Sequence, residues 1–249
     1  MITSPHEPDD HDTLPDDGGS AHGGGSFFGR RKGHKLRNHQ ADLIDNLLPR
    51  LALDIGSGAA PENLAELFDG ETDQIRLEIG FGGGEHLIAE AQTFPHTGFI
   101  GCEPYVNGMA KILTQIEALN IRNIRLYAGD AAELLAWAPP QSMARIDLIH
   151  PDPWPKRRHW KRRFVQDKTV AAMARIIRHD GEFRFVSDID DYCAWTLAHL
   201  LRSPDFYWTA ERADDWRQPW DGYTMTRYGR KAEREGRVAA YLRFRRVGG

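Results

Sequence analysis

The chain has 249 residues and a formal net charge of −4, with 32 basic and 36 acidic side chains. This length suffices for one domain with a sizeable core, and no run approaches the roughly 18 apolar residues of a membrane-spanning helix. Two cysteines, Cys102 and Cys193, lie in apolar stretches, which favours buried thiols in a reducing compartment. We therefore expect a cytoplasmic protein without a membrane partner.

Residues 1–26 consist mainly of Asp, Gly, Ser, Pro and His, and they hold six acidic residues but no Lys or Arg. Such a segment cannot bury enough apolar surface to offset the entropy cost of ordering, so we predict a disordered acidic tail. We interpret its three histidines as solvated and predict no metal site. The remaining residues carry a net charge of +2, because the tail accounts for six negative charges.

Residues 27–72 form a second segment, which begins with the aromatic and basic sequence FFGRRKGHKLR. Leucine and isoleucine recur at helical spacing between Leu36 and Leu51, which predicts a helix followed by a connector. Within the connector, residues 53–58 also resemble a strand that ends in a glycine turn. Pro61 follows this turn where a helix would be needed, so we favour a connector, with a nucleotide-binding turn as the alternative.

From residue 73 to residue 249, apolar runs of two kinds alternate, as expected for the strands and helices of a parallel sheet. The predicted strands are 75–79, 99–102, 124–128, 146–150, 182–187, 206–211 and 238–246. The predicted helices are 86–94, 106–119, 131–137, 164–178 and 192–201, with Gly181 as the C-terminal stop of the fourth. The pattern predicts an α/β fold with a doubly wound, mostly parallel seven-stranded sheet that ends in an antiparallel hairpin.

The first predicted strand runs into the sequence EIGFGGGE at residues 78–85. Glycines such as Gly80 and Gly82 let the backbone turn sharply and approach a ligand with no Cβ in the way. Glu85 stands where the dinucleotide fingerprint G-x-G-x-x-G requires its third glycine, which counts against NAD. Glu78 instead suits S-adenosylmethionine, because a carboxylate favours the cationic methionine end of that cofactor.

Two further acids stand at the ends of the next two predicted strands. Glu103 is placed to accept hydrogen bonds from ribose hydroxyls, and Asp130 could receive the adenine amino group. Since parallel strands bring their carboxyl ends to one edge of the sheet, these acids and the glycine turn would lie together. The ordered set predicts an S-adenosylmethionine site that includes Glu78, Gly80, Gly82, Glu103 and Asp130.

The fourth predicted strand leads into PDPWPKRRHWKRR at residues 151–163. A residue before proline is biased to extended geometry, so Asp152 is predicted to lie on a stiff loop beside the cofactor. Six of the eight residues after Pro155 are Lys or Arg, and His159 and Trp160 stand among them, which is typical of RNA-binding surfaces. A structural turn and a solvated basic face are the alternatives.

Residues 75–246 resemble the bacterial tRNA (guanine-N7)-methyltransferase family, which modifies guanine 46 in the variable loop of tRNA. The resemblance rests on LEIGFGGGEHL, FIGCEPYVNG, RLYAGDA, DLIHPDPWPKRRHWKRRFVQ, RFVSDIDDY and TRYG…GR…YLRFRR, and FFGRRKG with LLPRL extends it to Phe27. It implies that 73–249 is a Rossmann-like class I S-adenosylmethionine-dependent methyltransferase domain and that tRNA is the partner.

The resemblance also implies roles for individual residues. Asp152 would be the catalytic residue and would line the cofactor together with Glu78, Glu103 and Asp130. The implied substrate-binding residues are Lys156, Asp188, Thr226, Arg227, Tyr228 and Gly229. The implied RNA contacts are Arg158, His159, Trp160, Lys161, Arg162 and Arg163.

Two positions depart from the family pattern. The motif T-[KR]-[FY]-E ends here in Gly229, which removes a carboxylate that the family would direct at the base. Ser187 precedes Asp188 where threonine is usual, a mild change. Because of the first departure, Asp188 would have to carry more of the guanine recognition.

Methylation of guanine N7 makes modest chemical demands. This nitrogen carries an in-plane lone pair and no proton, so methyl transfer from a sulfonium requires alignment and no strong base. The product base gains positive charge, which a carboxylate such as Asp152 or Asp188 would stabilise.

The alternatives to this function are a methyltransferase acting on another RNA or on a small molecule, an NAD-linked oxidoreductase and a non-catalytic RNA-binding protein. Monomer and homodimer both stay open.

Overall fold

The computed structural model of the chain describes residue 29 and residues 31–248, and the predicted acidic tail with its histidines lies outside them. Seven strands form one sheet in the order β3-β2-β1-β4-β5-β7-β6. Their bounds are β1 Gln74–Ile79, β2 Thr97–Cys102, β3 Ile124–Tyr127, β4 Met143–Ile149, β5 Ile177–Ser187, β6 Phe206–Trp208 and β7 Ala240–Arg246. The first five strands pair in parallel, whereas β7 is antiparallel to both of its neighbours.

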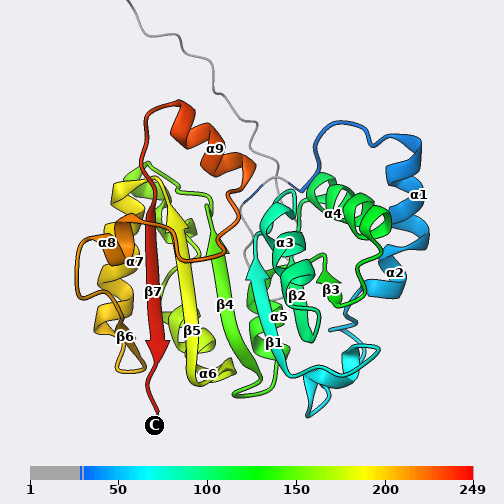
Figure 1. Ribbon diagram of the computed structural model, residues 1–249, viewed down its shortest axis with the longest axis horizontal. Coiled ribbons are helices and arrows are strands. Elements are labelled where there is room, and N and C mark those ends of the chain that lie inside the picture. The colour runs from blue at the N-terminus through cyan, green and yellow to red at the C-terminus, as the bar shows by residue number, and fades with distance from the viewer. Residues whose placement is uncertain (1–28, 30, 249) are drawn as a thin grey trace, which may run out of the picture.

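Helices cover both faces of this sheet (Figure 1). Their bounds are α1 Asn38–Asn46, α2 Leu48–Leu51, α3 Glu85–Thr93, α4 Val106–Leu119, α5 Ala131–Trp137, α6 Asp167–Ile176, α7 Asp190–Arg202, α8 Asp214–Arg217 and α9 Arg227–Arg234, with 3-10 helices η1 Leu64–Leu67 and η2 Arg157–Arg162. In this described part, none of the helices combines the length and apolar character that a membrane span requires. The structure thus confirms the predicted α/β fold with a mostly parallel sheet and an antiparallel pair at one end.

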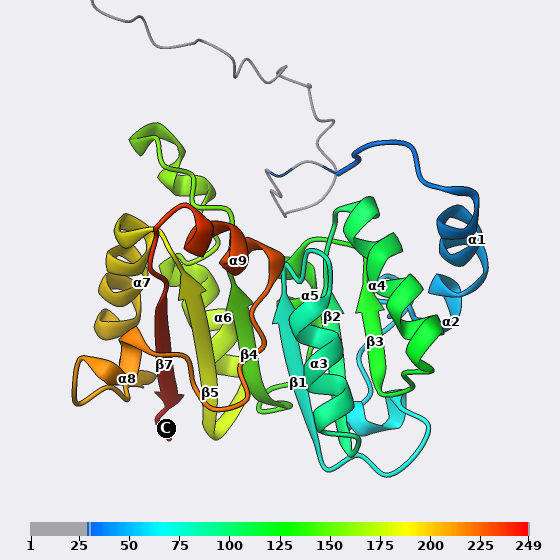
Figure 2. The same ribbon diagram turned by 45° about the horizontal axis from the view of Figure 1, so that its top comes forward.

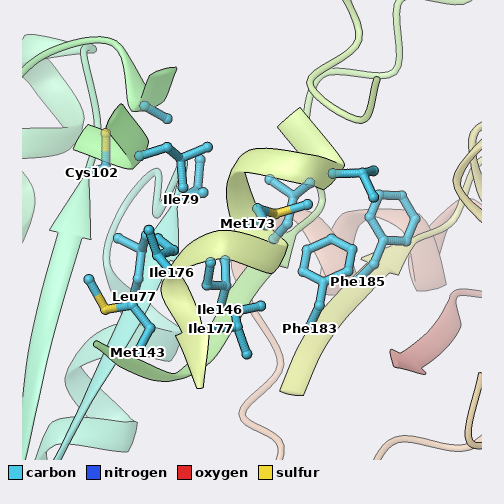
Figure 3. Close-up of a cluster of buried hydrophobic side chains, with 14 of the residues drawn as sticks. Leu77, Ile79, Cys102, Met143, Ile146, Met173, Ile176, Ile177, Phe183 and Phe185 are labelled. Carbon is cyan, nitrogen blue, oxygen red and sulfur yellow. The ribbon is translucent and has the colours of Figure 1, made fainter. Parts of the chain in front are cut away.

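Two apolar clusters hold the layers together, one on each face. Side chains of α5, α6 and α7 pack on one face against residues such as Ile146 and Phe183, as the close-up in Figure 3 shows for α6. On the other face, α1, α3 and α4 pack against residues such as Phe99 and Leu126. Because successive side chains of a strand point to opposite faces, each strand contributes to both cores. The parallel pairing of β1 to β5 places their carboxyl ends at one edge.

The predicted boundary between the fourth helix and the fifth strand is wrong, and the strand predicted over 206–211 already ends at Trp208. The fourth predicted helix, 164–178, is shorter: α6 ends at Ile176, β5 begins at Ile177, and Gly181 lies inside that strand. Ile177 pairs with Met143 across an irregular register, and a Cβ at Gly181 would lie 2.9 Å from the Ala144 carbonyl oxygen. Gly181 therefore serves the close approach of two strands and not the end of a helix.

The last helix occupies a position that the strand pattern did not predict. The connection from β6 to β7 contains α8 and α9, and α9 lies across the carboxyl ends of the parallel strands (Figures 1 and 2). Thr226 caps α9, because its side-chain oxygen accepts the Gly229 N–H at 3.2 Å. Residues 226–229 are thereby brought to the edge where the predicted cofactor residues lie.

Candidate active site

The glycine turn after β1 forms an open backbone cradle. Gly80 and Gly82 have φ angles of 70° and 59°, which favour glycine, and nothing lies within 4 Å of a Cβ built at Gly80. A Cβ built at Gly108, near the start of α4, would lie 2.4 Å from the Gly82 carbonyl oxygen. The turn is therefore packed closely against α4 on one side and open above Gly80, as a ligand that contacts the backbone requires.

Glu103 joins the end of β2 to this turn. Its carboxylate accepts the Gly82 N–H at 2.8 Å and the Tyr105 N–H at 2.9 Å. Burial raises the pKa of Glu103, and these two backbone hydrogen bonds oppose the rise. Each carboxylate oxygen can accept more than one hydrogen bond, so the group that holds the turn can also accept ribose hydroxyls.

Asp130 stands at the end of β3, beside the same edge of the sheet. Its Oδ1 accepts the Ala132 N–H at 2.9 Å and thereby caps α5. The open turn, Glu103 and Asp130 come from three adjacent parallel strands in the chain order that the sequence predicts. This arrangement fits S-adenosylmethionine, because an open backbone turn and two carboxylates lie together at one edge of the sheet.

Glu78 is buried and paired with a residue that the sequence did not single out. His86, in the first turn of α3, contacts the Glu78 carboxylate through Nδ1 at 2.7 Å, and both side chains are almost inaccessible to solvent. Burial alone would lower the pKa of His86, but the Glu78 carboxylate outweighs it and raises the pKa to about 9. The pair fixes the carboxylate that immediately precedes the glycine turn.

Asp152 lies on a loop whose backbone is held in uncommon geometry on both sides. His150 and Trp154 have φ angles of 49° and 43°, in the left-handed region that residues other than glycine rarely adopt. The Asp152 side chain is exposed at the carboxyl end of β4, yet the surrounding protein removes enough water to raise its pKa. Backbone strain of this kind is concentrated at functional sites.

Asp188 is held from two directions. Its Oδ1 lies 3.1 Å from His150 Nδ1, and its Oδ2 accepts the Arg237 Nε–H at 2.6 Å. A Cβ built at Gly229 would lie 3.2 Å from His150 Nε2, so the start of α9 rests on this imidazole. Asp188 thereby connects β5 to the chain that follows α9.

The segment 226–229 reaches the glycine turn. A Cβ built at Gly82 would lie 3.3 Å from Cε2 of Tyr228, and the Arg227 guanidinium covers the Tyr228 ring at 4.7 Å from its centroid. Residues predicted separately for cofactor and substrate therefore meet at one edge of the sheet.

The basic segment after Asp152 divides into exposed and packed residues. Lys156, Arg158 and Lys161 are exposed, whereas His159, Trp160 and Arg162 are partly buried. The Arg162 guanidinium lies 5.0 Å from the centroid of the Trp154 ring. The exposed cations of η2 and its flanks thus stand beside the Asp152 loop.

Arg163 does not belong to this exposed set, so its prediction as an RNA contact is wrong. Its side chain has an exposed fraction of 0%, and its guanidinium donates to the Pro153 carbonyl oxygen at 2.9 Å and to the Asp191 carboxylate. No surface of the guanidinium remains for a phosphate. The basic run in the sequence concealed this difference, because the burial arises from rings on α7.

Three polar partners in the site were not predicted from the sequence: His86, His150 and Arg237. The local signals were weak: His150 ends the apolar run before Asp152, and His86 follows shortly after the glycine turn. Arg237 belongs to the GR pair of the family motif, but nothing in the sequence links it to Asp188, from which 49 residues separate it.

The strand order, the glycine turn and the acids at successive strand ends define a class I S-adenosylmethionine-dependent methyltransferase, with S-adenosylmethionine as the methyl donor. The solved structure of the 16S rRNA methyltransferase KamB shares the fold, with a TM-score of 0.54 and 14% identity over 78% of this chain and 98% of that one. A family model described as “Putative methyltransferase” matches residues 72–242.

Two curated relatives identify the family more closely. A tRNA (guanine-N(7)-)-methyltransferase of Bradyrhizobium diazoefficiens is 79% identical over 221 residues, which are 89% of this chain and 93% of the relative. One of Rhodopseudomonas palustris strain BisB5 is 75% identical over 228 residues, which are 92% and 89% of the two chains. The chain belongs to the tRNA (guanine-N(7)-)-methyltransferase family.

Proposed function

We propose that this protein transfers the methyl group of S-adenosylmethionine to N7 of guanine 46 in the variable loop of tRNA. The observation that carries the proposal is the position of Asp152. Its carboxylate stands at the carboxyl end of β4, next to the glycine turn of β1, and the exposed cations of residues 156–161 follow it directly. A methyl donor, a carboxylate and a phosphate-binding surface would then share one edge of the sheet.

The roles of individual residues follow from their positions. Asp152 would stabilise the positive charge that develops on guanine as N7 gains the methyl group. Asp188 would accept hydrogen bonds from the N1 and N2 edge of the base, since Gly229 offers no carboxylate. Arg158 and Lys161 would contact tRNA phosphates, and these contacts position the substrate without reading its sequence.

The cofactor residues would hold the methyl donor against that base. Glu103 would accept the ribose hydroxyls, Asp130 the adenine amino group, and Glu78 would lie toward the methionine end. The glycine turn at Gly80 and Gly82 would allow the closest backbone approach. Alignment of N7, methyl carbon and sulfur can contribute roughly 7–11 kcal/mol to the lowering of the barrier.

Labelled S-adenosylmethionine and two unmodified tRNA transcripts test the proposal. One transcript carries guanine and the other adenine at position 46. We expect label on the guanine transcript alone, with chain cleavage at that position after mild reduction and aniline treatment, which is specific to N7-methylguanosine. Label on both transcripts would contradict the assignment to position 46. If neither transcript is labelled but S-adenosylmethionine still binds in equilibrium dialysis, the substrate is another RNA or a small molecule.

A further inference from the structure

Arg163 is a buried cation surrounded by aromatic rings. Its guanidinium carbon lies 4.9 Å from the ring centroid of Trp160, 5.0 Å from that of Tyr192 and 5.2 Å from that of Trp195. A guanidinium without access to water is costly unless its N–H groups are hydrogen-bonded and its charge is paired. The hydrogen-bond and charge partners of Arg163 therefore indicate which parts of the chain this side chain holds in place.

The partners of Arg163 come from two separate elements, the loop after β4 and the first turn of α7. Nε donates to the carbonyl oxygen of Pro153, the residue directly after Asp152. The terminal nitrogens donate to the carboxylate and to the carbonyl oxygen of Asp191, three residues after Asp188. One planar side chain thus joins the loop after β4 to the first turn of α7, which follows β5 after two residues.

Neighbouring contacts make this joint rigid. The Tyr192 hydroxyl oxygen accepts the Phe164 N–H at 3.1 Å, and Trp195 Nε1 donates to the Val165 carbonyl oxygen at 2.6 Å. The segment after Arg163 is therefore bound to α7 at several points. Because β4 and β5 are paired in parallel up to Ile149 and Val186, the segments that follow them leave the sheet side by side. Arg163 fixes how far apart they then lie.

We propose that Arg163 is a positioning residue that sets the geometry of Asp152 relative to Asp188. The inference rests on the proposed function, in which these two carboxylates act on one guanine. A shift of about 1 Å in a reacting group can reduce turnover about 10²-fold. Lysine cannot replace Arg163, because its single ammonium lacks the fork that reaches Pro153 and Asp191 together.

Steady-state kinetics of Arg163→Lys test the proposal. We expect kcat to fall about 10-fold or more, with the KM for tRNA and the salt dependence of tRNA binding unchanged. Arg158→Ala should show the opposite pattern, a higher KM and a shallower salt dependence, because that side chain is exposed. A wild-type kcat for Arg163→Lys, or a shallower salt dependence, would overturn the proposal.

Hydrogen exchange of residues 151–163 gives a second measurement that does not need activity. The exchange of this segment should accelerate in Arg163→Lys while that of the β-sheet stays the same; unchanged exchange in the segment would overturn the proposal. If the wild-type protein methylates no tRNA, the proposed function fails and the exchange result still decides the role of Arg163. If Arg163→Lys does not fold, Asp191→Asn takes its place, since that side chain is 54% exposed, and the same fall in kcat and faster exchange are expected.

Discussion

The carboxylate of Glu78 and the imidazole of His86 form a buried ion pair, 2.7 Å apart, between the end of β1 and the first turn of α3. The Glu78 charge raises the pKa of His86 to about 9, against an ordinary value of 6.5, despite the opposing effect of burial. A group with a raised pKa in the folded state stabilises the protein fully below its unfolded pKa and loses this contribution as pH rises through the folded value.

We therefore predict that the free energy of unfolding falls between about pH 6.5 and pH 9, by at most about 3 kcal/mol from this pair. His86→Gln should flatten that decline, as measured by urea unfolding at several pH values. His39→Gln serves as the control, because His39 belongs to an exposed pair with Glu117 and exposed pairs contribute little. An equal decline in His86→Gln and the wild type would show that the pair does not cause it.

Asp152→Ala tests the catalytic assignment. We expect turnover to fall at least about 10²-fold, because the charge that develops on the base loses its stabilising carboxylate. Binding of tRNA, measured by filter retention, should change little. Asp69→Asn is a suitable control, since Asp69 is 96% exposed and lies before β1 at the other end of the sheet. Wild-type turnover in Asp152→Ala would refute the assignment.

Asp188→Asn tests whether this side chain recognises the base. The substitution keeps the shape but removes the charge that holds His150 and Arg237, so kcat/KM for tRNA should fall about 10–100-fold. The affinity for S-adenosylmethionine should stay the same, because the contacts of Asp188 are His150, directly after β4, and Arg237, after α9. The exposed Asp190→Asn is the matched control, with activity close to wild type. A loss of cofactor affinity equal to the loss of kcat/KM would contradict a role in base recognition.

The double variant Arg158→Ala, Lys161→Ala tests the RNA surface. Both side chains are exposed next to the Asp152 loop. Each lost phosphate contact should reduce the slope of log K against log salt by about 0.7–0.9 and weaken binding to all tRNAs alike. Arg178→Ala, an exposed position at the start of β5, should leave the slope as it is. An unchanged slope in the double variant would place the phosphate contacts elsewhere.

Much of the arrangement of this candidate site could be predicted from the sequence. The alternation of strands and helices determines that Glu78 lies near the end of β1 and that Glu103, Asp130 and Asp152 follow the next three parallel strands. Parallel strands share a carboxyl edge. The glycine turn was readable for the same reason, since the positive φ values at Gly80 and Gly82 require residues without a Cβ. These features depend on local order along the chain.

Some features could not be read because they depend on contacts between distant residues. The boundary between α6 and β5 was misplaced, since Ile177 is apolar in either state and only its pairing with Met143 selects the strand. The conformation of residues 226–229 as the start of a helix over the glycine turn likewise depends on contacts with Gly82 and His150.

Arg163 is the clearest case of a residue whose position could not be predicted from the sequence. In sequence it is one of six cations after Pro155, and charge alone assigns all six to the same surface. The sequence by itself determined the fold, the cofactor edge and the presence of a basic segment, because these follow from periodicity and chain order. Only the tertiary structure decided which cation turns inward, because the rings of Tyr192 and Trp195 and the carboxylate of Asp191 become its neighbours only when α7 packs beside the loop.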